Sequence, residues 1–287
     1  MGEVGFDDLR TKEGEPVMKL RIALFCLLGG LCFTVPAMND GHFGYWWLSG
    51  IVTAAALAPV LRFGSRHMLA QFGTVSLVLV VIGLVCTMSE AVVFFPEMKK
   101  QMLASAVGGT VMYLIVAGAL TALAKVLKLT DLELSAIAHR PIGLVCPLVL
   151  VSAASYVVYY LIFGAIAFQF FTRQYYPHAT EQVAAMGTWF WGYQLARGLV
   201  MTLAVVPVIY TMRLPRWEAI LITGLLVWIV GGVGPLLVPS AMMTTTQRYI
   251  HIVEIMSQNV ALGMTAAWLL RPKMHTAQAA MHAVPTV

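Results

Sequence analysis

Eight apolar stretches dominate this sequence, and each is close to the ~20 residues that a helix needs to cross a bilayer core. They cover residues 18–37, 45–61, 72–95, 103–125, 142–171, 184–212, 218–240 and 250–270. A backbone in lipid must satisfy its own polar groups, which only helices and closed barrels achieve. The alternating pattern of barrel strands is absent from the sequence. The sequence therefore predicts an all-α, polytopic integral membrane bundle of about eight transmembrane helices.

Composition limits what else the chain can contain. Of its 287 residues, 60% are hydrophobic and 11% charged, whereas soluble domains are about 45–50% apolar. We expect residues 18–271 to form a single transmembrane domain between polar cytoplasmic tails, residues 1–17 and 272–287. No room remains for a soluble catalytic domain and no Walker A motif occurs, which excludes an ATP-driven pump on one chain. The loops are too short to bind nucleic acid specifically, and no basic patch suggests it.

The distribution of lysine and arginine predicts the orientation. Thirteen of the 18 basic residues lie in the amino-terminal flank, the carboxyl-terminal tail and the connections after the second, fourth and sixth stretches. Four lie in the other connections, and Arg197 lies within the sixth stretch. Because cytoplasmic loops are enriched in lysine and arginine, both termini are predicted to be cytoplasmic. We expect the protein to lie in the lipid bilayer of a plasma membrane or a bacterial inner membrane.

Two alternatives concern the helical organisation. Lys19 and Arg21, followed by an apolar run and Val35-Pro36-Ala37, resemble a cleavable signal peptide, although the long acidic segment before them suits a cytoplasmic tail better. An offset near 143 residues aligns Trp46 with Trp189, which suggests a weak 4+4 parallel repeat. Helix ends favour aromatic residues in any case, so the similarity is faint. No motif marks a resemblance to a known family.

Four ionisable residues fall inside predicted transmembrane helices: Glu90, Arg197, His251 and Glu254. A charge at the bilayer centre costs about 2.5–3.5 kcal/mol on insertion scales, so each needs a partner, water or a function. Arg197 lies near mid-membrane, and both glutamates lie in the outer half. The pattern predicts an ion pair between Arg197 and one of the two glutamates. It leaves open which one, and whether the pair only fixes helix packing.

Polar side chains at helical spacing point to the same depth. His251, Glu254 and Gln258 share one helix face, as do Tyr193, Gln194 and Arg197 on another helix. Ser152, Ser155, Tyr156 and Tyr159 form a third stripe. Such groups often only join helices. Three stripes together predict a polar cavity that opens outward.

These residues have the following predicted roles. Arg197 anchors a small polar or anionic solute, and Gln194, Tyr193, Tyr156 and Tyr159 orient it by hydrogen bonds. Glu90, His251 and Glu254 couple protons, because a histidine beside a carboxylate can titrate near neutral pH. No cofactor is predicted. A metal is an alternative at the same three residues, since His251 and Glu254 have the i, i+3 spacing that allows one helix to supply two ligands.

The sequence leaves three functions open. The favoured one is a binding or transport protein, not an enzyme. The first alternative is an integral-membrane enzyme that uses His251, Glu254 and Glu90 as a metal or acid/base site on a lipid or quinone. The second is a non-catalytic subunit or assembly factor with membrane-protein partners. In helix 218–240, the segment from Gly231 to Pro235 predicts either a break in the helix, as in many transporters, or close packing by small residues.

Overall fold

The computed structural model describes residues 6–36, 38, 41–94, 99–130, 140–175 and 179–272. Within these ranges the chain is helical and has no β-strand beyond one isolated bridge between Ser240 and Met243. This confirms the predicted all-α class. The helix α1 begins at Phe6, so the described part of the predicted tail, residues 6–17, continues the first helix. Residues 273–287 of the other predicted tail lie outside the described residues.

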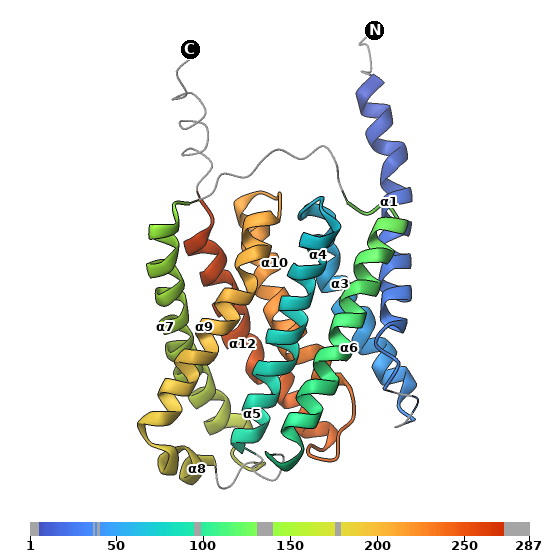
Figure 1. The fold of residues 1–287 in the computed structure, drawn as a ribbon. Helices are drawn as coiled ribbons and strands as arrows, with labels where there is room; N and C mark the ends of the chain where they lie inside the picture. Colours follow the sequence, from blue (N-terminus) through green and yellow to red (C-terminus); the bar gives the residue numbers. More distant parts are fainter. Residues whose placement is uncertain are drawn as a thin grey trace.

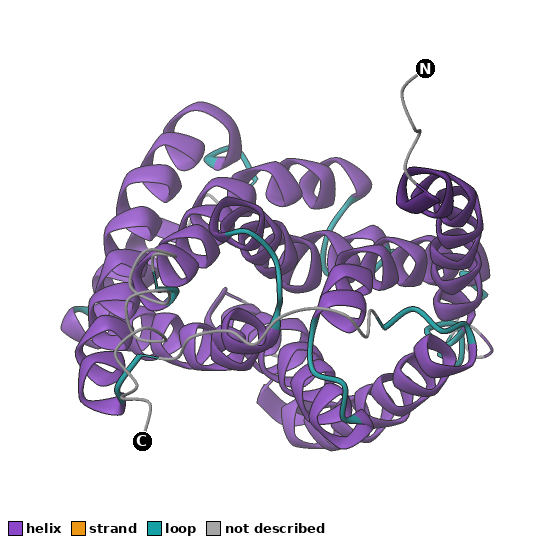
Figure 2. Cartoon of the chain, turned by 90° about the horizontal axis from the view of Figure 1, so that it is seen from above, coloured by secondary structure: helices purple, strands orange, loops and turns teal. Residues whose placement is uncertain are grey.

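The helices pack side by side with their long axes roughly parallel, as Figures 1 and 2 show from two directions. In chain order they are α1 (Phe6–Leu31), α3 (Phe43–Phe63), α4 (Met68–Leu77), η1 (Val78–Cys86), α5 (Thr87–Phe94), α6 (Lys99–Val126), α7 (Ile142–Ala167), η3 (Phe168–Thr172), α8 (Ala179–Met186), α9 (Thr188–Thr211), α10 (Arg216–Trp228), η4 (Ile229–Val233), α11 (Gly234–Leu237) and α12 (Thr245–Leu270).

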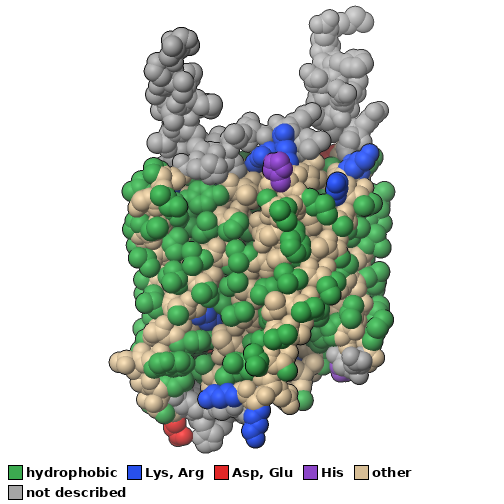
Figure 3. All heavy atoms as spheres, in the orientation of Figure 1, with side chains coloured by type: hydrophobic (Ala, Val, Ile, Leu, Met, Phe, Trp, Pro, Cys, Tyr) green, Lys and Arg blue, Asp and Glu red, His purple; other side chains and the backbone are tan. Residues whose placement is uncertain are grey.

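Six of the described helices are long and apolar enough to cross a membrane. They are Phe43–Phe63, Met68–Phe94, Lys99–Val126, Ile142–Thr172, Thr188–Thr211 and Arg216–Leu237. Figure 3 shows a broad band of hydrophobic side chains on the visible flank, with lysine and arginine side chains above and below it. The chain is therefore a membrane protein by the length and composition of these helices. Of the eight predicted spans, those that correspond to α1 and α12 are not in this set of six.

The structure explains why α12 is less apolar than its neighbours. Its buried residues include Arg248, Gln258 and Asn259, and these polar side chains face the bundle instead of lipid. The helix packs extensively against α7 and α10. A polar helix surrounded by apolar ones is the arrangement expected where a membrane bundle holds an internal polar site.

Glycines allow the closest helix crossings. A Cβ on Gly263 of α12 would lie 2.6 Å from the Thr223 carbonyl oxygen and 2.8 Å from the Gly224 Cα of α10. A Cβ on Gly50 of α3 would lie 2.5 Å from the Gly30 carbonyl oxygen of α1. Both distances are below normal contact, so only glycine permits these backbones to approach. Small residues at helix interfaces are how membrane helices gain van der Waals contact.

The segment from Gly231 to Pro235 does not break the helix. The α-helix α10 passes into the π-helical segment η4 and then into α11, and the backbone stays helical from Arg216 to Leu237. Pro235 has no N–H to donate, and the hydroxyl of Ser49 donates to the Gly234 carbonyl at 2.7 Å. Gly232 also packs closely, because a Cβ there would lie 2.4 Å from Ile255 Cδ1. Close packing by small residues is therefore present, within a helix that changes to π-helical geometry but does not break.

Arg271 links the end of α12 to the end of α9 by hydrogen bonds. Arg271, just beyond α12, donates to the carbonyls of Ile209 and Met212 at 3.2 and 2.8 Å, and also to the carbonyl of Leu214. Burial lowers the pKa of the Arg271 guanidinium, because loss of water disfavours the charged form. Helix carboxyl ends carry partial negative charge, so a buried cation here is stabilised.

Candidate functional site

A cavity of about 550 Å³ lies at the end of the bundle opposite the start of α1 and the end of α12. Its walls come from α5, from α7 with η3, from α8 and the start of α9, from the segment between η4 and Met243, and from the first half of α12. A volume of this size is within the range of small-molecule sites. The residues at this end of the bundle thus surround a space large enough for a small molecule.

Most of the cavity wall is apolar and aromatic. Its rings belong to Phe94, Tyr160, Phe168, Phe190 and Trp191. The polar groups are few, and four of them lie on α12. They are Glu90, Arg248, His251, Glu254 and Gln258, with hydroxyls from Thr87, Thr172, Thr180 and Ser240.

Arg197 pairs with Glu90. Its Nη2 donates to Glu90 Oε2 at 2.5 Å, and the two side chains are 4% and 12% exposed. This resolves which glutamate Arg197 contacts. The guanidinium carbon also lies 5.7 Å from the centroid of the Tyr156 ring. Both side chains are largely buried in membrane-spanning helices. Removal of either partner from such an ion pair would leave the other charge uncompensated, which is costly.

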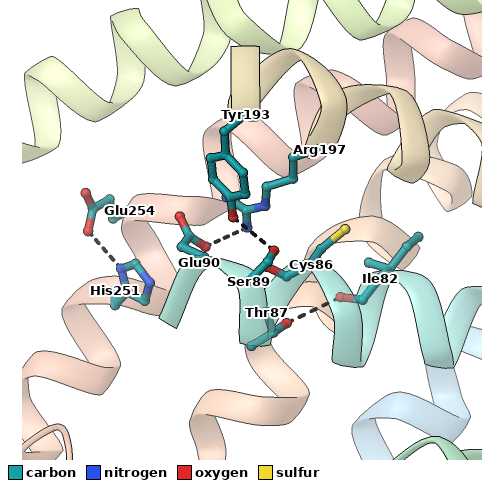
Figure 4. A network of polar contacts seen from close by, with 9 residues as sticks. All are labelled: Ile82, Cys86, Thr87, Ser89, Glu90, Tyr193, Arg197, His251 and Glu254. Carbon is teal, nitrogen blue, oxygen red and sulfur yellow. Dashed lines mark hydrogen bonds and ion pairs between the residues drawn. The ribbon is translucent and has the colours of Figure 1, made fainter. Parts of the chain in front are cut away.

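His251 and Glu254 form a second pair on α12. Nδ1 of the imidazole lies 3.0 Å from Glu254 Oε2, and both side chains are partly exposed, at 20% and 16%. Figure 4 shows this pair beside the pair of Glu90 and Arg197. The carboxylates of Glu90 and Glu254 therefore border one space from two different helices. The three predicted proton-coupling residues are brought together at this cavity.

The five residues predicted to bind the solute lie elsewhere. None of Arg197, Gln194, Tyr193, Tyr156 and Tyr159 is among the residues that line the cavity. Tyr156 and Gln194 are fully buried. The Tyr193 hydroxyl donates to Ser89 Oγ at 2.9 Å, and the Tyr159 hydroxyl lies 2.8 Å from Thr265 Oγ1. The first contact joins α9 to α5 beside the Arg197–Glu90 ion pair, and the second joins α7 to α12.

Sequence reasoning missed Arg248 and Tyr160. Arg248 is 2% exposed, and its Nη1 donates to the carbonyls of Leu236 and Leu237 at 3.2 and 2.9 Å. The signal was present, since Arg248 precedes His251 by three residues and so continues its face of α12. Tyr160 follows Tyr159 directly, and nothing in the sequence shows which of the two faces a cavity.

Several buried polar atoms near the cavity have no hydrogen-bond partner within the part of the chain that the structure describes. They include Nε and Nη1 of Arg197, both amide atoms of Gln194, the Tyr156 hydroxyl, Nε of Arg248 and Oε1 of Gln258. Native proteins leave few such atoms. Water or a solute would satisfy them, and Arg248 and Gln258 belong to the cavity wall.

The described residues contain no group of three or more histidine, cysteine, aspartate or glutamate side chains that could hold a metal ion. His251, Glu254 and Glu90 therefore share a cavity without forming a ligand set. The four cysteines have free thiols.

A second, smaller cavity of about 240 Å³ borders the first. Thr87 and Pro235 line both cavities. The second one extends between α3, η1, α6 and η4, towards Leu79 and Tyr113. The π-helical segment η4 and Pro235 thus lie at the boundary between two internal spaces.

Comparison with known protein families, curated proteins and solved structures yields no match for this chain. What the fold defines is a class: a helical membrane protein, with six helices able to span a bilayer in the part of the chain that the structure describes.

Proposed function

We propose that this chain is a membrane-embedded binding or transport protein whose cavity takes up a small solute from the side opposite the termini. The observation that carries the proposal is the cavity itself. It combines a mostly apolar wall with two carboxylates and a histidine from two helices. Binding sites for small molecules have this composition, with few polar groups in an apolar surround.

Transport fits the arrangement better than a purely structural role. The Arg197 and Glu90 pair alone would suffice to hold α5 against α9. The second pair, His251 and Glu254, is partly exposed to the cavity and joins residues of one helix, so it holds no helices together. The π-helical segment η4 also lines both cavities, through Gly231 and Val230, and π-helical segments are frequent at functional sites.

Proton coupling is assigned to His251 and Glu254. The charge of an ordinary histidine changes between about pH 5 and 8, and the groups that act on His251 are Glu254 on its own helix, Glu90 from α5 and Arg197 from α9. The same residues could serve an enzyme as acid and base on a lipid or quinone. The proposal includes no cofactor. The remaining alternative, a non-catalytic subunit or assembly factor, would give the cavity no role.

Cavity access tests the proposal. In a chain whose four native cysteines are replaced by alanine, Thr87→Cys is expected to react with a small membrane-impermeant thiosulfonate added from outside, because Thr87 lines the cavity. Ser240→Cys at the exposed rim should react faster, and fully buried Thr223→Cys should not react. A Thr87→Cys protein that resists the reagent while Ser240→Cys reacts would rule out a solvent-filled cavity.

We further propose eight crossings, with α1 and α12 added to the six apolar helices, and both termini in the cytoplasm. The first four long helices and the last four each pack mainly among themselves, which agrees with a 4+4 parallel organisation. Thirteen basic residues on the side of the termini favour this orientation.

Topology mapping checks the crossings. An epitope at either terminus is expected to be protected in intact cells, whereas Met242→Cys, before α12, should be labelled from outside. The reason is that α12 separates Met242 from the carboxyl terminus. If Met242→Cys and the carboxyl-terminal epitope react from the same side, α12 does not cross the membrane.

A further inference from the structure

We infer that the solute of the main cavity is an organic cation, specifically a protonated amine carried on an apolar body. The inference rests on the proposed function, which it deepens by naming the class of ligand. It differs from the polar or anionic solute expected from sequence, because that expectation relied on Arg197 as the anchor. Arg197 does not line the cavity and is bonded to Glu90.

Three acceptor groups converge on the cavity. Glu90 and Glu254 each use Oε2 for a partner within the protein, which leaves the second carboxylate oxygen of each. Gln258 is 3% exposed, lines the cavity, and has no partner for Oε1 among the described residues. An ammonium group offers three donors and no acceptor. It therefore matches this set of oxygens, whereas a carboxylate or phosphate would repel two of them.

The two terminal nitrogens of the arginine in the cavity wall are hydrogen-bonded within the protein, and only its Nε lacks a partner among the described residues. Arg248 is the one arginine that lines the cavity within the described residues. Its Nη1 binds two carbonyls at the end of α11, and its Nη2 binds the Thr245 hydroxyl. Arg248 also precedes Glu254 by six residues, about 9 Å along a helix. A cation at Glu254 would thus sit away from Arg248.

The aromatic wall suits the rest of such a ligand. Tyr160, Phe190 and Trp191 lie together at this cavity, with 5.7 Å between the first two ring centroids and 5.3 Å between the last two. Aromatic faces attract cations and also cover apolar groups. An ammonium near Glu254 with a hydrocarbon body along these rings would fill both parts of the site.

Three ligands with one skeleton and different charge test this inference: 4-phenylbutylammonium, 4-phenylbutanoate and 4-phenyl-1-butanol. Calorimetry on the purified full-length protein is expected to show at least about tenfold tighter binding of the ammonium, equal to about 1.4 kcal/mol. Glu254→Gln and Gln258→Met should each weaken it severalfold. Glu218→Gln, an exposed carboxylate on α10, is the matched control and should leave the affinity unchanged.

Acidification should also weaken ammonium binding, because a protonated His251 places a cation beside Glu254. Between about pH 8 and 5.5 the affinity is expected to fall, and His251→Gln should remove most of that dependence. The groups facing His251 are Glu254 and, from other helices, Glu90 and Arg197.

The outcomes separate the two proposals. Equal or tighter binding of the butanoate or the alcohol would overturn the cation inference while the cavity stays a binding site. Failure of all three ligands to bind would overturn it too. If Thr87→Cys is then also unreactive, the proposed function fails as well.

Discussion

Arg197→Met is expected to lower the free energy of unfolding by about 3–5 kcal/mol, the cost of leaving one partner of a buried ion pair uncompensated. In this protein the stranded group would be Glu90, whose side chain is 12% exposed in a membrane-spanning helix. The purified variant should therefore show a large fall in melting temperature in detergent, or fail to accumulate in the membrane.

A double variant supplies the control for this prediction. Arg197→Met combined with Glu90→Gln removes both charges, so it should recover much of the stability that the single change loses. Equal stability of the wild type and Arg197→Met would show that Glu90 has another compensating partner or is already neutral, and that the pair is not needed for the fold.

Gly263→Val is expected to destabilise the protein by about 3 kcal/mol or more, at the upper end of overpacking costs. Its new side chain would meet the Thr223 carbonyl oxygen and the Gly224 backbone of α10 at less than 3.0 Å. Because α12 also carries His251 and Glu254, forced separation of these helices should change the cavity as well as the melting temperature.

The matched control is Gly108→Val in α6. A Cβ at Gly108 meets no atom within 4 Å among the described residues, so the same substitution should change the melting temperature by only a small amount. Similar losses at both glycines would mean that the effect comes from valine in a helix and not from the crossing of α10 and α12.

Periodicity and charge were enough to predict the helical class and to find the ionisable residues of the site. Glu90, His251 and Glu254 stood out because charged groups in apolar helices are rare. The same rule identified Arg197. These are local properties of the sequence, and they do not depend on how the helices are arranged.

The pairing of Arg197 with Glu90 could not be predicted, because Glu90 and Glu254 lie at similar depths. The π-helical segment η1 ends only four residues before Glu90. Its wider turns rotate α5 relative to a continuous α-helix, so a helical projection from Met68 does not give the direction of Glu90.

The residues that line the cavity could also not be predicted from the sequence. Tyr159 and Tyr160 are adjacent, yet Tyr159 contacts Thr265 of α12 and Tyr160 faces the cavity. Which of two neighbours faces inward depends on the rotation of α7 against its partners. That rotation is set by tertiary packing, which the sequence does not show. The proposed solute differs from the polar or anionic one expected from sequence because Arg197 is bonded to Glu90 and does not line the cavity.

The central claim is that the space between Glu90, Glu254 and Gln258 is a solute site. An experimentally determined structure of the full chain in lipid, at a resolution that shows ordered water, tests it most directly. We predict density for water or a solute within hydrogen-bonding distance of the Glu254 carboxylate and of Gln258 Oε1. A dry, close-packed contact between α5, α7 and α12 at this position would contradict the claim and make both charged pairs structural.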